Sequence, residues 1–173
     1  MADNTDQFDR LRLIRSPNIG PVTYRQLITR FGTATKALDA LPDLVMRGGG
    51  KGAVLADRRV IDEEITATQK SGARYLFLDD ADYPELLSHL DNAPPAIIIH
   101  GDVGLLRRTP VAMVGARNAS AGACRFARTL AYELGQGGFA VVSGLARGID
   151  TAAHAGSIDS GTIAVIAGGI DIA

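Results

Sequence analysis

Hydrophobic positions follow different patterns in different parts of the chain. Up to about residue 70 they recur at helical spacing, and from 109 onward short apolar runs alternate with amphipathic stretches in the order β-α-β-α-β. The segment 71–108 holds two short strand candidates. The pattern predicts a small helical domain over 1–70. Over 71–173 it predicts the N-terminal part of a Rossmann-like domain with a parallel sheet. Within this part, residues 71–108 form a connecting segment that carries edge strands.

The segment 16–27 has the pattern of helix, tight turn and helix. Gly20 permits a positive φ in the turn, and Pro21 suits the first turn of the second helix. This arrangement resembles the helix-hairpin-helix motif of SAM-like domains, whose turn can bind a DNA phosphate through backbone N–H groups. Because Pro21 lacks an N–H, a structural hairpin without a ligand is favoured here.

Two glycine-bearing loops follow apolar runs in the last part of the chain, within 111–120 and 141–150. Each run predicts a buried parallel strand, and each loop opens a helix, the second one capped by Asp150. A third strand over 162–166 leads to Gly168 and Gly169. Short crossovers make the strands parallel, so all these loops are expected at the carboxyl edge of one sheet. Helix starts of this kind bind anions.

Several side chains in these loops suit a phosphate. Gly115 lies in the first loop, and Arg117 and Arg147 can each form a bidentate pair with a phosphate. The alternative for Arg147 is a salt bridge with Asp150. Ser120 and Ser143 can donate hydroxyls to phosphate oxygens while also serving as a helix cap and in a turn.

The loops do not fit a dinucleotide or a catalytic triad. Arg117 replaces the second glycine of Gly-x-Gly-x-x-Gly, and no acidic residue follows the second strand, so neither NAD nor FAD, and no other cofactor, is expected. Ser143, Asp150 and His154 lack the Gly-x-Ser-x-Gly elbow of a hydrolase.

Charge and composition narrow the class of partner. The net charge is −1, and no basic tail exists, so nucleic acid would bind in a local pocket, which disfavours duplex binding. No apolar run is long enough to span a membrane. The single cysteine, Cys124, suits a reducing compartment, and a cytoplasmic location is expected.

The loops and their flanking strands closely resemble the DNA-processing protein A family, also called Smf, as does the N-terminal SAM-like region. The matching segments are Met113–Arg117, Val142–His154, Thr162–Val165 and Gly168–Asp171, with Asp82–Leu87 and Pro94–Pro95 upstream. The resemblance implies a single-stranded DNA binder rather than an enzyme, one that protects incoming DNA during natural transformation and helps load the RecA recombinase.

By residue match, the resemblance makes Arg117 the main phosphate-binding residue and assigns backbone donors to the Ser143–Gly144 and Gly168–Gly169 loops. The chain departs from the family at Ala116, where a serine is usual, and at Ala121, where a tyrosine is common; both suggest altered contacts. The family also continues beyond this sequence. We therefore expect a longer chain with a completed Rossmann-like domain, a homodimer in the full-length protein, and RecA contacts largely in the remaining half.

One enzymatic alternative remains, a nucleotide-binding Rossmann-like enzyme of the phosphoribohydrolase type. Such enzymes carry a Pro-Gly-Gly-x-Gly-Thr loop followed by a catalytic glutamate. The nearest segment here, 167–171, has neither feature.

Overall fold

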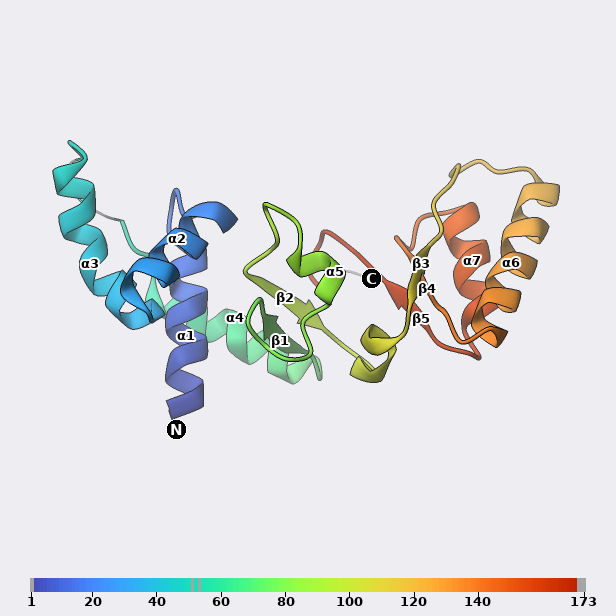
Figure 1. Ribbon diagram of the computed structural model, residues 1–173, viewed down its shortest axis with the longest axis horizontal. Coiled ribbons are helices and arrows are strands. Elements are labelled where there is room, and N and C mark those ends of the chain that lie inside the picture. Colours follow the sequence, from blue (N-terminus) through green and yellow to red (C-terminus); the bar gives the residue numbers. More distant parts are fainter. Residues whose placement is uncertain (1, 51, 53, 171–173) are drawn as a thin grey trace. The chain divides into compact units, whose positions relative to one another are not determined.

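The computed structural model describes residues 2–50, 52 and 54–170 of the 173-residue chain. It divides into two compact units, Met1–Ile99 and His100–Ala173, called here the helical unit and the sheet unit (Figure 1). The sequence pattern places a boundary at about residue 70. Contacts within the structure group the strand pair that follows with the helices, because Tyr75 and Phe77 pack against Ile61 and Ile65.

The helical unit contains five helices and one antiparallel strand pair among its described residues. The elements are α1 (Ala2–Arg15), α2 (Pro21–Phe31), α3 (Ala34–Arg47), α4 (Arg58–Lys70), β1 (Arg74–Phe77), α5 (Glu85–Ser88) and β2 (Ala96–Ile99). Strand β1 pairs with β2 from Arg74 opposite Ile99 to Phe77 opposite Ala96. One core cluster joins α1, α2 and α3 around Leu13, and a second joins α1, α4 and the strand pair around Leu11.

The predicted hairpin between α1 and α2 is present, but its turn differs in detail. Pro21 is the first residue of α2, as expected from its fixed φ. Gly20 has a φ of −85°, and the left-handed residue of the turn is Asn18, with a φ of 65°. The expectation of a positive φ at Gly20 is therefore wrong. Asparagine tolerates this conformation better than other non-glycine residues.

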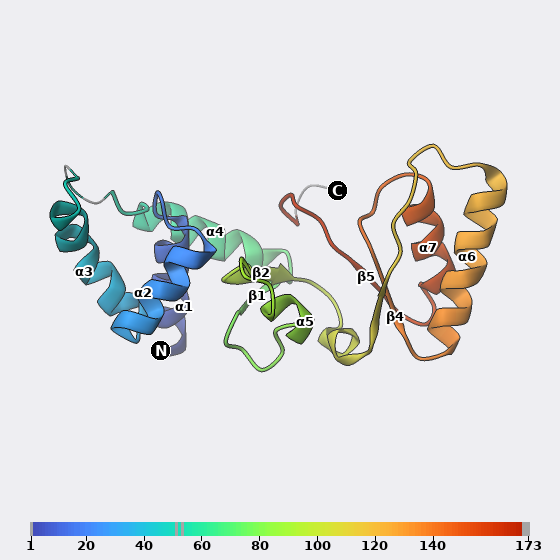
Figure 2. The same ribbon diagram turned by 45° about the horizontal axis from the view of Figure 1, so that its top comes forward.

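The sheet unit has the predicted β-α-β-α-β order. Its elements are a 3₁₀ turn η1 (Val103–Arg107), then β3 (Pro110–Ala112), α6 (Ala121–Gln136), β4 (Ala140–Ser143), α7 (Ile149–Ser157) and β5 (Thr162–Ala164). The strands are parallel in the order β3-β4-β5. Two right-handed crossovers in the same direction place both helices on one face of the sheet (Figures 1 and 2). The predicted Rossmann-like fold is confirmed.

Small residues bring α6 and α7 close together. The core between the helices and the sheet is built from Met113, Ala127, Ala131, Val141 and Ala153. At Gly156 of α7 an added Cβ would lie 2.2 Å from the carbonyl oxygen of Arg128, so only glycine fits this approach. The helices therefore meet backbone to backbone at this level.

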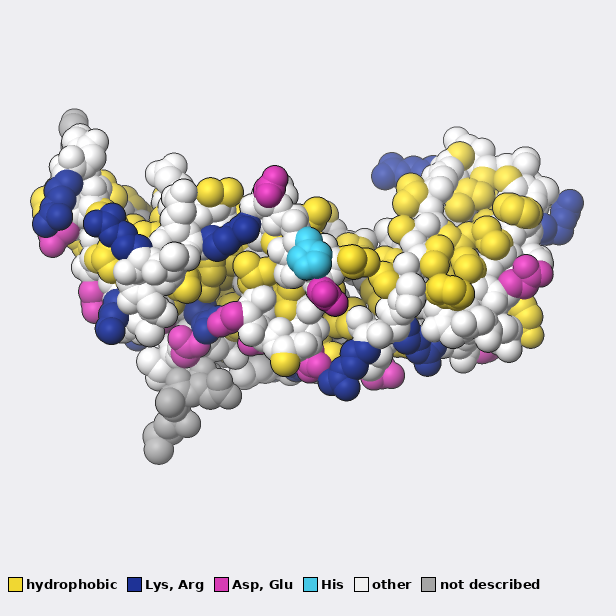
Figure 3. All heavy atoms as spheres, in the orientation of Figure 1, with side chains coloured by type: hydrophobic (Ala, Val, Ile, Leu, Met, Phe, Trp, Pro, Cys, Tyr) yellow, Lys and Arg dark blue, Asp and Glu magenta, His cyan; other side chains and the backbone are white. Residues whose placement is uncertain are grey.

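The surface of the sheet unit carries many large hydrophobic side chains (Figure 3). Those most exposed include Val114, Phe126, Ile158, Val165 and Leu145. Because α6 and α7 share one face, no described helix of the sheet unit packs on the opposite face of its sheet. No helix among the described residues has the length and apolar character needed to cross a bilayer.

Candidate nucleic-acid interface

Three loops lie at the carboxyl edge of the parallel sheet, and we call them the edge loops. They are the segment 113–120 between β3 and α6, the segment 144–148 between β4 and α7, and the segment 165–170 after β5. Since β3, β4 and β5 are parallel neighbours, their carboxyl ends lie next to one another. This is the edge at which open α/β sheets bind ligands.

The first two edge loops are joined through glycines. Gly148 has a φ of +83°, and an added Cβ there would lie 2.3 Å from the carbonyl oxygen of Ala116. The N–H of Ile149 donates to that same oxygen at 3.3 Å. At Gly115 an added Cβ would collide with the side chain of Ile149, at 2.5 Å. Gly115 therefore has a packing role, and any contact with a phosphate would be additional to it.

Asp150 occupies the backbone donors of the second edge loop. Its Oδ2 accepts hydrogen bonds from the N–H groups of Gly144 at 3.2 Å and Ala146 at 3.4 Å. Leu145 between them is left-handed, with a φ of 58°, which turns both N–H groups toward one point. The N-cap of α7 is Gly148, so the prediction that Asp150 caps this helix is wrong. The carboxylate instead binds the loop as an internal anion.

The two predicted serines have different surroundings. Ser143 is only 5% exposed, and its hydroxyl donates to the carbonyl oxygen of Met113 at 2.7 Å, so its one hydrogen is used inside the fold. This hydroxyl therefore already has an acceptor within the fold, and a contact between Ser143 and a phosphate stays a prediction. Ser120 is the predicted N-cap of α6, and its Oγ accepts from the N–H of Ala123 at 3.2 Å. Ser120 is exposed and keeps its own hydroxyl hydrogen for a ligand.

Both arginines of the edge loops are exposed. Within the described residues, neither Arg117 nor Arg147 forms an ion pair or a side-chain hydrogen bond. The alternative of a salt bridge between Arg147 and Asp150 is not realised. Gly168 and Gly169 are also exposed, and an added Cβ at Gly168 would meet no atom within 4 Å. Asp171, which follows them in the motif, lies outside the described residues.

His154 has a structural role. Thr162 Oγ1 donates its hydrogen to the carbonyl oxygen of Val141, so the 2.9 Å contact between Thr162 Oγ1 and His154 Nδ1 requires a proton on Nδ1. Nε2 is then a buried acceptor without a partner among the described residues. Burial lowers the pKa of His154, and the charge of Asp150 opposes this only in part. Because Ser143 and His154 share no hydrogen bond, the residues do not form a hydrolase triad.

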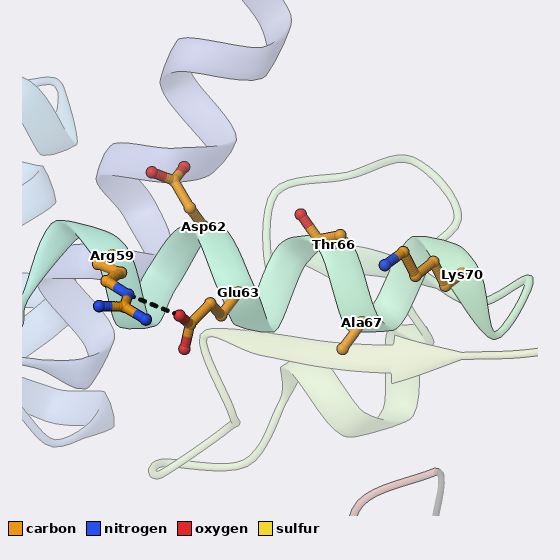
Figure 4. Close-up of a pocket in the computed structure, with 6 residues that line it drawn as sticks. All are labelled: Arg59, Asp62, Glu63, Thr66, Ala67 and Lys70. Carbon is orange, nitrogen blue, oxygen red and sulfur yellow. Dashed lines mark hydrogen bonds and ion pairs between the residues drawn. The ribbon is translucent and has the colours of Figure 1, made fainter.

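A concave surface also lies on the helical unit, along the exposed side of α4 (Figure 4). Its charged groups are of both signs, and Arg59 is paired with Glu63 at 2.8 Å. Asp62 projects from the same stretch of helix. The carboxylates would repel a phosphate, so this surface does not suit nucleic acid.

Sequence reasoning missed two arginines near the edge loops, Arg125 and Arg128 of α6. They line a groove together with Arg147. No motif marks them, and the signal that could have found them is their i,i+3 spacing on a helix that begins at the carboxyl edge.

These observations define a class of protein: a Rossmann-like unit with an exposed arginine pair at its carboxyl edge, joined to a helix-hairpin-helix unit. Comparison with known families gives the same two parts. Residues 74–173 match the family described as DNA recombination-mediator protein A, and residues 4–67 match the DprA-like N-terminal HHH domain. The chain belongs to this DprA/Smf family, which confirms the resemblance drawn from its motifs.

Individual members of the family are similar to this chain in sequence and in fold. Protein Smf of Synechocystis is 28% identical over 182 residues, covering 98% of this chain and 46% of the relative. DNA processing protein DprA of Streptococcus pneumoniae is 39% identical over 100 residues, covering 57% of this chain and 35% of the relative. The crystal structure of that DprA superimposes with a TM-score of 0.69 at 27% identity, covering 96% of this chain and 59% of the other. The chain thus spans less than half the length of these curated relatives.

Proposed function

We propose that this chain binds single-stranded DNA at the edge loops, as part of a recombination mediator that protects incoming DNA in natural transformation and loads the RecA recombinase on it. The observation that carries the proposal is the exposed guanidinium of Arg117, which has no ion-pair partner among the described residues. An arginine in the loop that leads into a helix, with no carboxylate paired to it among the described residues, suits a phosphate. Family membership supports the recombination role.

The edge loops offer a defined set of contacts to a strand. Arg117 would hold a phosphate bidentately, and Arg147 a second one. Ser120 would contribute its hydroxyl, and the backbone of Gly168 and Gly169 is exposed and accessible to a ligand. Because Asp150 already binds the N–H of Gly144, that donor contributes only if the carboxylate gives way. The contacts address the sugar-phosphate backbone, so binding should depend little on base sequence.

The wider role is a proposal about the whole protein, since the chain covers only 46% and 35% of the length of the two relatives compared above. We place it in the cytoplasm, acting without catalysis or a cofactor, as a homodimer in its full-length form. RecA and the second subunit would contact parts beyond the edge loops. The enzymatic alternative, a phosphoribohydrolase, has no specific observation in its favour.

The test is fluorescence anisotropy of a labelled oligothymidylate titrated with the chain at two salt concentrations. We expect salt-sensitive binding, because each neutralised phosphate releases counterions. Arg117→Ala should weaken binding by about 1–3 kcal/mol, the range for a lost charge-assisted contact. Arg59→Ala is the matched control, since it removes the same charge from an exposed helix face in the helical unit.

Equal affinities for the parent and Arg117→Ala would contradict the site. No binding by the folded parent at low salt would contradict DNA binding itself. In that case a thermal-shift comparison of mononucleotides with oligonucleotides would show whether the edge loops hold a small nucleotide instead.

A further inference from the structure

A groove of about 520 Å³ runs between α6 and α7, and we call it the α6–α7 groove. Its lining comes from both helices and from the residues that lead into α7. The lining residues are Cys124, Arg125, Arg128, Arg147, Gly148, Thr151, Ala152 and Ala155.

The position of the groove follows from how the helices pack. Both helices start at the carboxyl edge of the sheet, because each follows a parallel strand. They meet tightly at the level of Gly156 and Arg128. The lining residues run from the residues that lead into α7 and the first turns of both helices to Arg128, at the level of that contact, so the groove opens toward the edge loops. The positive ends of both helix dipoles lie there as well.

The charge of the groove has one sign. Three arginines line it, and no lining residue is acidic. Within the described residues Arg125 and Arg128 form no ion pair or side-chain hydrogen bond, as is also true of Arg147. Like charges at i,i+3 weaken an isolated helix slightly, so this pair adds no stability to α6.

Nearby carboxylates do not neutralise the groove. Asp150 is buried and bound to the backbone of the second edge loop. Glu133 lies about 140° around α6 from Arg128 at 100° per residue. Asp159 comes after the end of α7 at Ser157. The groove therefore complements an anionic chain.

The groove is continuous with the proposed phosphate site. Arg147 belongs both to the second edge loop and to the groove. Its neighbour Gly148 touches the backbone of the first edge loop, where an added Cβ would lie 2.7 Å from the carbonyl oxygen of Arg117. A strand held at Arg117 would reach the groove across Arg147. None of the residues that line the groove is acidic.

We propose that a bound single strand continues from Arg117 over Arg147 into the α6–α7 groove, where Arg125 and Arg128 each contact a further phosphate. This extension rests on the proposed function, since it needs a strand at the edge loops. It makes the site longer than the glycine-bearing loops indicate. The occupant is the sugar-phosphate backbone, because the lining offers guanidinium groups and no exposed aromatic ring on which a base could stack.

The first test uses salt dependence with oligothymidylates of about six and about twenty nucleotides. The double variant Arg125→Gln/Arg128→Gln should lower the salt slope for the longer strand by about 1.4, at about 0.7 for each phosphate. Its affinity for the shorter strand should stay unchanged. The control, Arg59→Gln, should alter neither. An unchanged slope in a double variant that binds the longer strand would overturn the groove while leaving the site at Arg117 in place.

The second test needs no variant. Cys124 is the single cysteine of the chain, is partly exposed and lines the groove. The longer strand at saturation should slow its reaction with a thiol reagent several-fold, and the shorter strand should not. A rate unchanged by the longer strand would overturn the proposal. Failure of the parent to bind either strand would overturn the proposed function and this extension together.

Discussion

Two arginines of the helical unit, Arg10 and Arg15, form ion pairs, whereas the two arginines at the edge of the sheet unit form none among the described residues. Arg10 pairs with Asp6 at 2.6 Å and bidentately with Asp79, and Arg15 pairs with Glu64 at 2.6 Å. Arg117 and Arg147 have no such partner among the described residues. The difference teaches that counting positive charges does not locate a phosphate site. Whether each guanidinium is already paired must be considered as well.

The ion pair between Arg10 and Asp79 also changes the pKa of both groups. The hydrogen bonds from Arg10 lower the pKa of Asp79, and the hydrogen bond with Asp79 raises that of Arg10. These residues tie α1 to the segment after β1, far along the chain. In the sheet unit the bound carboxylate is Asp150, whose partners are backbone N–H groups. The arginines there remain available.

The largest effect is expected where the edge loops join. Gly148→Ala places a Cβ 2.3 Å from the carbonyl oxygen of Ala116 and strains a φ of +83°. We expect a loss of about 2–5 kcal/mol in the free energy of unfolding, from overpacking and backbone strain together. Urea denaturation followed by circular dichroism measures it.

Gly138→Ala is the matched control for Gly148. Its φ is +84°, yet an added Cβ would meet nothing within 4 Å. Only the cost of a left-handed backbone, about 1–2 kcal/mol in the free energy of unfolding, is therefore expected. Equal losses in the two variants would show that the first two edge loops are not held together at Gly148.

A smaller effect is expected at the internal anion. Asp150→Ala leaves the N–H groups of Gly144 and Ala146 without their acceptor, and should lower stability by about 1–3 kcal/mol. Asp150→Asn keeps an oxygen at this place and should lose less. If thermal denaturation gives no loss for Asp150→Ala, the carboxylate does not hold the loop.

The sequence predicted the elements of the sheet unit because their signals are local. Short apolar runs separated by one helix each leave little choice but parallel strands. It also placed Ser120 at the helix cap and Pro21 in the first turn of α2. These assignments depend on neighbouring residues alone.

Contacts between distant segments could not be predicted in the same way. The hydroxyl of Ser143 donates to Met113, which lies 30 residues earlier. The role of Gly115 depends on Ile149, and that of Gly148 on Ala116. A motif shows which residues are present, and only the fold shows which of them are already used.

The smallest effect concerns pH, and it differs between the units. Burial lowers the pKa of His154 below its ordinary value of 6.5, so the unfolded chain binds the extra proton first. The sheet unit should therefore lose stability as pH falls below about 6.5, on the order of 1 kcal/mol or less. The pKa of Asp79 is lowered, so its contribution to the helical unit is kept above about pH 4 and is lost as pH falls through its folded pKa.

Urea unfolding at about pH 7.5 and 5.5 tests the histidine part of this prediction. His154→Asn is the comparison, because its amide can replace the Nδ1–H donor to Thr162 and does not titrate. The loss between the two pH values should shrink in that variant. A loss of the same size in both proteins would assign it to other groups.

The most direct measurement compares Arg10→Ala with Arg117→Ala for both stability and oligothymidylate affinity. We predict that Arg10→Ala lowers the free energy of unfolding by about 1–2 kcal/mol and leaves affinity unchanged. Arg117→Ala should keep stability within about 0.5 kcal/mol and weaken binding by about 1–3 kcal/mol. If Arg117→Ala instead destabilises the fold, or Arg10→Ala weakens binding as much, the division between structural and ligand-binding arginines is contradicted.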